Sequence, residues 1–238
     1  AERWQVSRED QDAFAYESHR RALAAIEAGH FDAEIAPFTV TAAVPDLAGG
    51  AVALQSREVT VDEGPRADTS AERLAKLRPV FRAGGSVTAG NSSQMSDGAG
   101  ALLLASEKAV KDHDLEPVGR FVGFAVAGVA PEVMGIGPIE AIPRALRQAG
   151  LTLADLDWIE LNEAFAAQSL AVINELGLDR DKVNPQGGAI ALGHPLGATG
   201  AIRAATLMHG LKRTGGRYGM VTMCIGTGMG AAGIFERL

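Results

Sequence analysis

Three short segments of the sequence combine residue types that could do chemistry. They are Asn162-Glu163-Ala164-Phe165, the glycine-rich run 187–195 that includes His194, and the stretch 224–230 that begins with Cys224. Each is expected where a strand or loop meets a helix or a tight turn, and such junctions in α/β folds collect functional groups. A thiol, an imidazole and a side-chain amide together suit proton transfer and the stabilisation of an oxyanion.

Cys224 is the only cysteine of the chain. A lone cysteine is often simply a small buried hydrophobic residue. Here Gly226, Gly228 and Gly230 follow it, and glycines let the backbone fold so that several N–H groups point at one spot, which forms an anion nest. A thiol beside such a nest is expected to have a lowered pKa, which would suit proton transfer or nucleophilic attack.

His194 lies between Gly193 and Pro195. A histidine taken at random is more often a surface or satisfied core residue, but this setting predicts an imidazole held at a loop apex, where it could activate a thiol or donate to an oxyanion. The run before it lacks the Gly-Lys-Ser/Thr ending of a Walker loop. Asn162 has two equal interpretations: it caps the next helix, or its amide holds a water against developing negative charge. Glu163 also suits a helix N-terminus.

Composition excludes several classes of protein. The net charge of −7 makes the chain a poor general binder of nucleic acid or of an anionic membrane. One cysteine excludes an internal disulfide and a multi-cysteine zinc site, and it fits a reducing, cytoplasmic compartment. No apolar run is long enough to span a membrane. The first residues include no Met and no apolar leader, so we expect an internal cut there.

The first half of the chain has a mixed pattern. A helix is predicted from Ser7 to about Ala28, followed by an irregular excursion over residues 30–70 with short alternating pieces. Val87 and Thr88 are expected in a strand that ends in the loop 89–93. The apolar stretch Gly100–Ser106 is predicted to be a buried strand or helix, which periodicity alone cannot decide.

The second half alternates regularly between strand and helix, which indicates an α/β layered fold. The last two strands are separated by a glycine-rich turn and should pair antiparallel. The final helix is apolar around most of its circumference and is therefore expected between layers. The predicted strands are 121–129, 157–161, 217–223 and 231–236, and the predicted helices are 139–148, 164–176 and 200–213.

The three segments, in this order, closely resemble the corresponding motifs of thiolases. The loop 88–93 with Ser96-Asp97-Gly98-Ala99 resembles them too, and so does the stretch 134–138. The resemblance covers essentially the whole chain. It implies a layered α-β-α-β-α fold, present here as the remainder of the loop domain plus the C-terminal half, in dimers or tetramers. Residues 1–84 would be loop domain that covers coenzyme A, 85–115 would complete the N-terminal half, and 116–238 would be the C-terminal domain.

The resemblance also implies roles for the chemical groups. In thiolases a cysteine of the N-terminal half carries the acyl group, and no candidate for it occurs here. Cys224 matches the second cysteine, the acid/base, while His194 and a water held by Asn162 would stabilise an enolate oxygen. The N–H of Gly226 would contribute to a second oxyanion hole. No metal or cofactor is expected, since coenzyme A is a substrate. The isolated chain is expected to be inactive without the N-terminal half.

The same resemblance implies a binding site for acyl-CoA and CoA. Ser93 would contact the pantetheine arm, beside Ala89 and Gly90. Phe165 and Met134 would lie near the reacting thioester, and Arg66 near the adenine. Simpler interpretations stay open, because Phe165 and Met134 are apolar and could only pack, and Ser93 could only cap a helix.

Two other functions compete with a thiolase that degrades 3-ketoacyl-CoA or runs the reverse condensation. One is a thiolase-like binding or scaffold subunit that has lost catalysis. The other is a ketoacyl synthase of the same superfamily, which generally lacks a cysteine at the site of Cys224. The presence of His194, Asn162 and Cys224 favours the catalytic interpretation.

Overall fold

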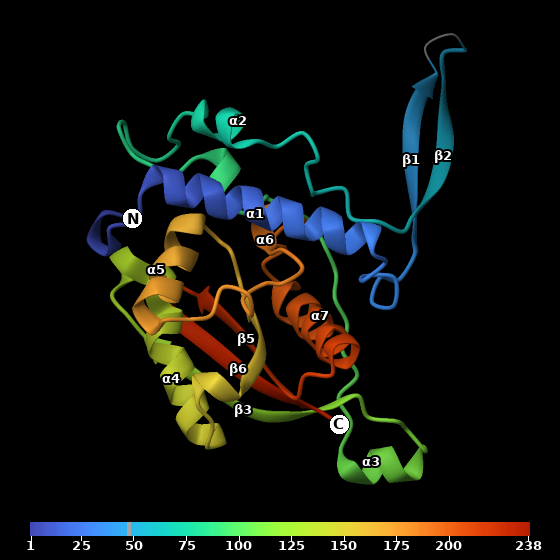
Figure 1. Ribbon diagram of the computed structural model, residues 1–238. Coiled ribbons are helices and arrows are strands. Elements are labelled where there is room, and N and C mark those ends of the chain that lie inside the picture. Colours follow the sequence, from blue (N-terminus) through green and yellow to red (C-terminus); the bar gives the residue numbers. More distant parts are fainter. Residues whose placement is uncertain (47–48) are drawn as a thin grey trace.

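The computed structural model describes residues 1–46 and 49–238. At its centre is a mixed sheet with strand order β3-β6-β5-β4 (Figure 1). Strand β4 (Leu156–Leu161) runs parallel to β5 (Tyr218–Ile225), whereas β5 pairs antiparallel with β6 (Met229–Arg237), and β6 with β3 (Gly119–Gly128). These strands confirm the four predicted in the second half of the sequence, including the antiparallel final pair.

Helices pack on both faces of this sheet. Helix α4 (Gly137–Ala149) packs on β3, β5 and β6, and helix α7 (Thr199–Thr214) packs on β4, β5 and β6. Met220 belongs to one buried cluster and its neighbour Val221 to the other. Because successive strand residues point to opposite faces, the sheet separates two cores. The predicted α/β layered architecture is therefore confirmed.

Two glycines follow the last residues of helices in the C-terminal half. Helix α4 ends at Gly150 and helix α5 (Ala166–Leu176) ends at Gly177, with φ of 67° and 63° respectively. Only glycine adopts this left-handed conformation without cost, and it therefore commonly follows the last helical residue. The N-cap of α5 is Phe165, so Asn162 does not cap this helix and its amide is available for another role.

Helix α1 (Arg8–Glu27) begins after Ser7, whose side chain accepts the N–H of Asp10, as predicted. It lies across the top of the body in Figure 1 and contacts α5, the short helix α6 (Ala189–Leu192) and the short helix α2 (Ala71–Ala75). A single long helix thus joins the N-terminal segments to the C-terminal layers.

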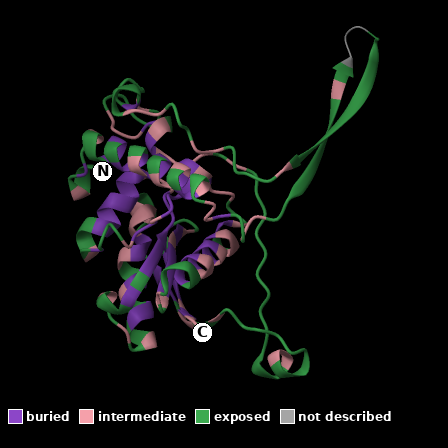
Figure 2. Cartoon of the chain, turned by 45° about the vertical axis from the view of Figure 1, so that its right-hand side comes forward, coloured by how far each residue is buried: buried purple, intermediate pink, exposed green. Residues whose placement is uncertain are grey.

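The expectation of an irregular excursion over residues 30–70 was wrong for its central part. Strands β1 (Phe38–Asp46) and β2 (Ala51–Val59) pair antiparallel in a hairpin that projects from the body (Figures 1 and 2). Residues 47 and 48 lie outside the described residues. Phe38 is 69% exposed and Leu54 75% exposed. Phe38, Val40 and Ala42 do alternate with Thr39 and Thr41, but the described residues of the hairpin are exposed or half-buried on both faces, so the alternation does not mark a buried face here.

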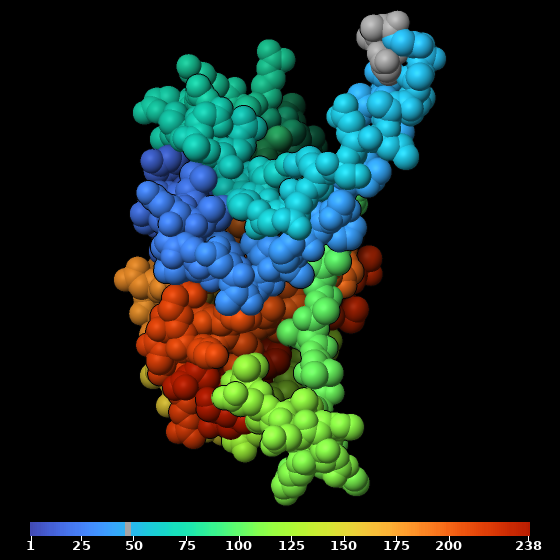
Figure 3. All heavy atoms as spheres, turned by 90° about the vertical axis from the view of Figure 1, so that its right-hand side faces the viewer, coloured from blue at the N-terminus to red at the C-terminus, as the bar shows by residue number. Residues whose placement is uncertain are grey.

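The expectation of a buried element at Gly100–Ser106 was also wrong. The segment has no regular secondary structure and lies on the surface before the short helix α3 (Glu107–Asp112), as the light green chain in Figure 3 shows. Leu103 and Leu104 are each 83% exposed. An apolar segment is usually buried by other parts of the protein. Among the described residues, this segment is packed only near Gly100, which lies against Ile202 of α7.

One further difference is smaller. Val87 and Thr88 do not form a strand, and Thr88 makes only an isolated bridge to Pro79. Helix α7 was predicted to lie between layers, and its apolar side chains are buried or half-buried. One face of the helix packs on the sheet. The segment around Gly98 and Gly100 packs against Ile202 on the other face.

Candidate active site

Two of the predicted motifs follow neighbouring parallel strands. Asn162 comes directly after β4, and its backbone N–H donates to the carbonyl of Thr222 in β5 at 2.9 Å. Cys224 lies two residues farther along β5. Because parallel strands end at the same edge of a sheet, the amide and the thiol are carried to the same edge.

The third motif reaches this edge from another direction. His194 follows α6 and Gly193, whose φ of 92° lies in the region that favours glycine. The Nδ2 of Asn162 lies 3.3 Å from Nε2 of His194. The structure therefore joins two of the residues singled out in the sequence through a direct hydrogen bond.

The hydrogen bonds around His194 define its tautomer. The Thr199 hydroxyl donates its one proton to the carbonyl of Pro195 at 2.9 Å, and the same oxygen lies 2.7 Å from His194 Nδ1. It must therefore accept a proton from Nδ1, which leaves the Nε2 lone pair facing the N–H of Asn162. Nε2 is thus the nitrogen that can take a proton.

Burial and charge keep this imidazole neutral. Burial lowers the pKa of His194 below its usual value, and the nearby Arg203 guanidinium lowers it further. The buried Oδ1 of Asn162 accepts no hydrogen bond from the described residues. An acceptor of this kind beside a neutral base suits a bound water or a polar group of a ligand.

The expected low pKa of Cys224 was wrong. Burial raises the pKa of the Cys224 thiol, and a backbone hydrogen bond only partly opposes the effect. The glycines do bend the chain, since Gly226 and Gly228 have φ of 55° and 122°, but the cost of desolvating a thiolate outweighs the backbone dipoles. A thiol that stays protonated is suited to donating a proton.

Glu163 is buried below the site rather than placed at a helix N-terminus. Its carboxylate accepts from the Ser18 hydroxyl at 2.7 Å, from Asn184 Nδ2 at 2.8 Å and from the N–H of Ile190 at 3.1 Å. A Cβ on Gly188 would lie 2.1 Å from the carboxylate carbon. Glu163 thus fixes the start of the segment that carries His194, a role that the sequence did not indicate.

The predicted CoA-binding loop lies against the Asn162–Phe165 segment. The N–H of Ser93 donates to the carbonyl of Ala164 at 3.0 Å, and Ser92 bridges to Phe165. Ala89 and Gly90 form a short 3₁₀ turn, Ala89–Asn91, capped by the Thr88 side chain. The turn, Ser93 and Phe165 are therefore neighbours in space, as the motifs suggested.

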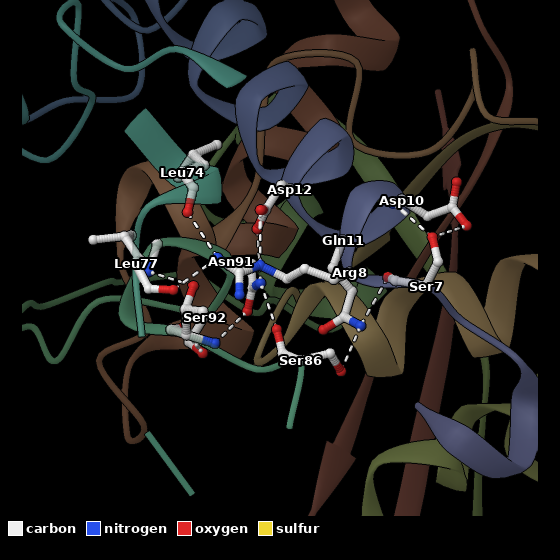
Figure 4. Close-up of polar contacts among 12 residues, drawn as sticks. Ser7, Arg8, Asp10, Gln11, Asp12, Leu74, Leu77, Ser86, Asn91 and Ser92 are labelled. Atoms are coloured by element: carbon white, nitrogen blue, oxygen red, sulfur yellow. Dashed lines mark hydrogen bonds and ion pairs between the residues drawn. The ribbon is translucent and has the colours of Figure 1, made fainter. Parts of the chain in front are cut away.

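Helix α1 holds this loop in place (Figure 4). The Asn91 side chain donates to Asp12 at 2.9 Å and accepts the N–H of Thr88 at 2.8 Å. Arg8 pairs with the same Asp12 at 2.8 Å and donates to the carbonyl of Leu74. A buried polar network of this kind is rigid when every member is satisfied.

Three other residues complete the description. Phe81, which the sequence analysis missed, packs edge-to-face on Phe165 with ring centroids 5.8 Å apart and is 72% exposed. Met134 lies in the 3₁₀ helix Pro131–Ile136, which packs against β5, β6 and α5. Arg66 donates its backbone N–H to His19, and its exposed guanidinium pairs with Asp68.

Among residues 1–46 and 49–238, no cluster of three or more His, Cys, Asp and Glu side chains is placed to hold a metal ion. None of the helices in this described part is long and apolar enough to cross a membrane.

Comparison with known families matches both parts of the chain. The model of the thiolase C-terminal domain matches residues 115–237, which include Asn162, His194 and Cys224, and that of the thiolase N-terminal domain matches residues 1–108. The chain belongs to the thiolase family.

Individual relatives agree with this assignment. A 3-ketoacyl-CoA thiolase of Bacillus subtilis is 54% identical over 99% of the chain, and so is the human peroxisomal 3-ketoacyl-CoA thiolase. The chain covers 60% of the first and 55% of the second, so it spans a little over half the length of these relatives.

Solved structures confirm the thiolase fold. The Bacillus anthracis acetyl-CoA acetyltransferase superposes with a TM-score of 0.93 at 47% identity, over 100% of this chain and 58% of that one. The human mitochondrial 3-ketoacyl-CoA thiolase in complex with CoA gives a TM-score of 0.91 at 47% identity, over 100% of this chain and 57% of that chain.

Proposed function

We propose that this chain supplies the acid–base and oxyanion-binding part of an acetyl-CoA acyltransferase. The proposed reaction is the CoA-dependent cleavage of a 3-ketoacyl-CoA into acetyl-CoA and a shortened acyl-CoA, or the reverse condensation. The observation that carries the proposal is the hydrogen bond between Asn162 and His194, beside the strand that carries Cys224.

The first half of the reaction makes an acyl-enzyme. His194 Nε2 takes the proton of a nucleophilic cysteine, whose sulfur attacks the 3-keto carbon. The bond between carbons 2 and 3 breaks and leaves an acetyl-CoA enolate. Its oxygen is stabilised by His194, now protonated at Nε2, and by a water held by Asn162. Cys224 gives its proton to carbon 2, which releases acetyl-CoA.

The second half transfers the acyl group. The Cys224 thiolate takes the proton of an incoming CoA thiol, and the CoA sulfur attacks the acyl-enzyme thioester. The N–H of Gly226 stabilises the oxyanion that forms. The nucleophilic thiolate then leaves and is reprotonated by His194. The raised pKa of Cys224 supports this role, because the group must be a thiol before it can donate.

The nucleophilic cysteine has to come from outside these 238 residues, because Cys224 is the only cysteine among them. The exposed segment 102–104 supports the idea that another polypeptide segment packs on it, since Leu103 and Leu104 are each 83% exposed. We therefore propose that a polypeptide segment bearing the nucleophile packs against this surface, in a homodimer or tetramer, and that the isolated chain is inactive.

The substrate site is proposed from the same arrangement. Ser93, Ala89 and Gly90 would hold the pantetheine arm of CoA, with Phe165 and Met134 near the thioester and Arg66 near the adenine. The position of the first three beside Phe165 supports this site, as does the CoA complex named for the human mitochondrial relative. We propose a cytoplasmic location, which fractionation must test because some relatives are named peroxisomal or mitochondrial.

The decisive experiment measures acetoacetyl-CoA cleavage by the full-length protein and by this chain alone, freed of host thiolase. We expect activity in the full-length protein and none in the isolated chain. CoA-dependent turnover by the isolated chain that Cys224→Ser abolishes would show that Cys224 is itself the nucleophile. A full-length protein that binds acyl-CoA without cleaving it would favour the competing scaffold function.

A further inference from the structure

A buried arginine connects the segments that carry the active-site groups. Arg203 of α7 is 2% exposed, and its guanidinium donates to Glu160 at 3.3 Å and to the carbonyl of Gly187 at 3.5 Å. Glu160 is fully buried in β4, and its other oxygen accepts the indole N–H of Trp158 at 2.6 Å. The arginine thus bridges a strand and a loop from its position on a helix.

Each of these contacts lies close in sequence to an active-site residue. Glu160 stands two residues before Asn162 at the same strand end, and Gly187 opens the run 187–195 that includes His194. Thr199, one helical turn before Arg203, binds Nδ1 of His194 at 2.7 Å. A guanidinium is planar and presents five N–H groups in fixed directions, so a single side chain can set the relative positions of strand, loop and helix.

We propose that Arg203, acting with Glu160, is a positioning residue that fixes the position of Asn162 relative to His194. It touches neither substrate nor reacting atoms in this scheme. Only the effect of Arg203 on turnover rests on the proposed function, because the position of the His194 ring can be followed by NMR without any reaction.

The electrostatics of the interior agree with this geometry. Burial raises the pKa of Glu160 and of Glu163, and Arg203 works against that rise at both carboxyls. The same guanidinium acts on two more carboxyls of raised pKa, Glu34 and Asp62. Arg203 is therefore the cation common to these four carboxyls, of which Glu160 and Glu163 are buried, and its removal would leave Glu160 free to take a proton and become neutral.

A purely structural ion pair predicts a different result from a positioning pair. Breaking a buried pair costs stability whatever its role. Loss of the Arg203 charge alone raises the His194 midpoint, so the titration of Arg203→Met reports that charge and not the position of the ring. A displaced imidazole is recognised in Arg203→Lys, which keeps the charge, by a changed NMR shift of His194 together with a fall in kcat larger than the change in KM.

The experiment uses three variants of the full-length protein: Arg203→Met, Arg203→Lys and Glu160→Gln. Imidazole NMR titration reports on His194, whose signal is assigned with a His194→Gln variant, and acetoacetyl-CoA cleavage reports on turnover. We expect Arg203→Met to raise the midpoint of the His194 titration and to lower kcat by about 10-fold or more, with a smaller change in KM.

Arg203→Lys separates charge from geometry. It keeps the positive charge, so the His194 midpoint should stay low, but an ammonium on a flexible stem cannot reproduce the fixed fork, so kcat should still fall. Glu160→Gln keeps an acceptor for Trp158 and removes the partner of Arg203, and it should also lower kcat. In both variants a fall in kcat larger than the change in KM supports the proposal.

An unchanged His194 titration together with unchanged kcat in Arg203→Met would overturn the proposal, even if the thermal midpoint fell. Should Arg203→Met fail to fold, wild-type kcat in both Arg203→Lys and Glu160→Gln would overturn it. If even the wild-type protein shows no acyl transfer, the proposed function fails. The imidazole NMR shift of His194 in Arg203→Lys, where the charge is kept, then decides the present inference: a changed shift supports it and a wild-type shift overturns it.

Discussion

Asn162 and His194 lie 32 residues apart in the sequence and meet through a 3.3 Å hydrogen bond between Nδ2 and Nε2. The contact leaves Oδ1 of Asn162 without a partner among the described residues, while Nδ1 of His194 is fixed by Thr199. Asn162 thus offers a free acceptor, Oδ1, close to the basic Nε2 of His194. The following predictions test what this pair does.

Loss of the imidazole should affect turnover more than binding. We expect His194→Ala in the full-length protein to lower kcat by about 10² to 10⁴-fold, with a much smaller effect on KM, because a general base acts mainly in the transition state. His209→Ala is the matched control, since His209 is half-buried on α7 and its pKa is also lowered by burial. Equal losses in both variants would indicate a folding defect and not a catalytic role.

Cys224 should behave as a protonated thiol near neutral pH. Because burial raises its pKa, we expect alkylation by iodoacetamide to be slow at pH 7 and to accelerate only in alkaline solution. Cys224→Ala should lower kcat while leaving CoA binding, measured by calorimetry, nearly unchanged. Rapid labelling at pH 6 would mean that the thiol is a thiolate there, and the proton-donor role would have to be abandoned.

Glu34 should make stability depend on pH. Burial raises its pKa from 4.5 to about 7, so the folded protein favours the protonated form. Its contribution is fully present below about pH 4.5, the unfolded pKa, and is lost as pH rises through about 7. We expect Glu34→Gln to be more stable than wild type at pH 8 by on the order of 1 kcal/mol, after solvent screening, and similar at pH 4.5.

Urea unfolding at the two pH values measures this difference. Glu58→Gln, on the exposed hairpin, is the control for removing a carboxylate charge far from the interior. A Glu34→Gln protein with the same stability as wild type at pH 8 would show that this carboxyl is not destabilising when ionised.

Gly188 should tolerate no side chain, although its φ of −131° suits any residue. The obstacle is steric, because a Cβ there would lie 2.1 Å from the Glu163 carboxylate carbon. We expect Gly188→Ala to cost about 2 to 4 kcal/mol and to lower kcat, since the Glu163 hydrogen bonds must break. Gly150→Ala is the comparison: nothing lies within 4 Å, so only the left-handed φ should cost about 1 kcal/mol, with kcat unchanged.

The exposed leucines should make the isolated chain associate. We expect this chain to bind an apolar dye and to sediment as more than a monomer, because Leu103 and Leu104 are almost fully exposed. The double variant Leu103→Asp with Leu104→Asp should reduce both effects without changing stability. Lys108→Asp, an exposed charge change on α3, is the control and should leave association unchanged.

Much of the fold could be predicted because its signals are local. Gly150 and Gly177 end helices through their own backbone freedom, and Ser7 caps α1 through its own hydroxyl, so each signal lies within a few residues of its effect. The β5–β6 pair was predictable for the same reason, since the glycines between Cys224 and Met229 mark a tight turn.

The failures involve features that depend on distant partners. The apolar pattern of residues 100–106 predicts burial, but the pattern cannot say which part of the protein provides the cover. The pKa of Cys224 was predicted from the neighbouring glycines, and desolvation by the rest of the fold reversed its direction. Phe81 was missed, and Glu163 was expected only at a helix N-terminus, because their contacts with Phe165 and Ser18 join segments far apart in the chain.

Two residues of α1, Asp12 and Ser18, each hold a segment of the site, and their spacing limits where insertions and deletions can occur in α1. Asp12 holds the Asn91 turn and Ser18 holds Glu163, and six residues of helix separate them by about 9 Å along its axis. An insertion of one residue between them would rotate one anchor by about 100° relative to the other and detach either the Asn91 turn or the His194 segment. Natural length variation should therefore be excluded from this stretch of α1 and concentrated beyond Glu27, where no such spacing has to be kept.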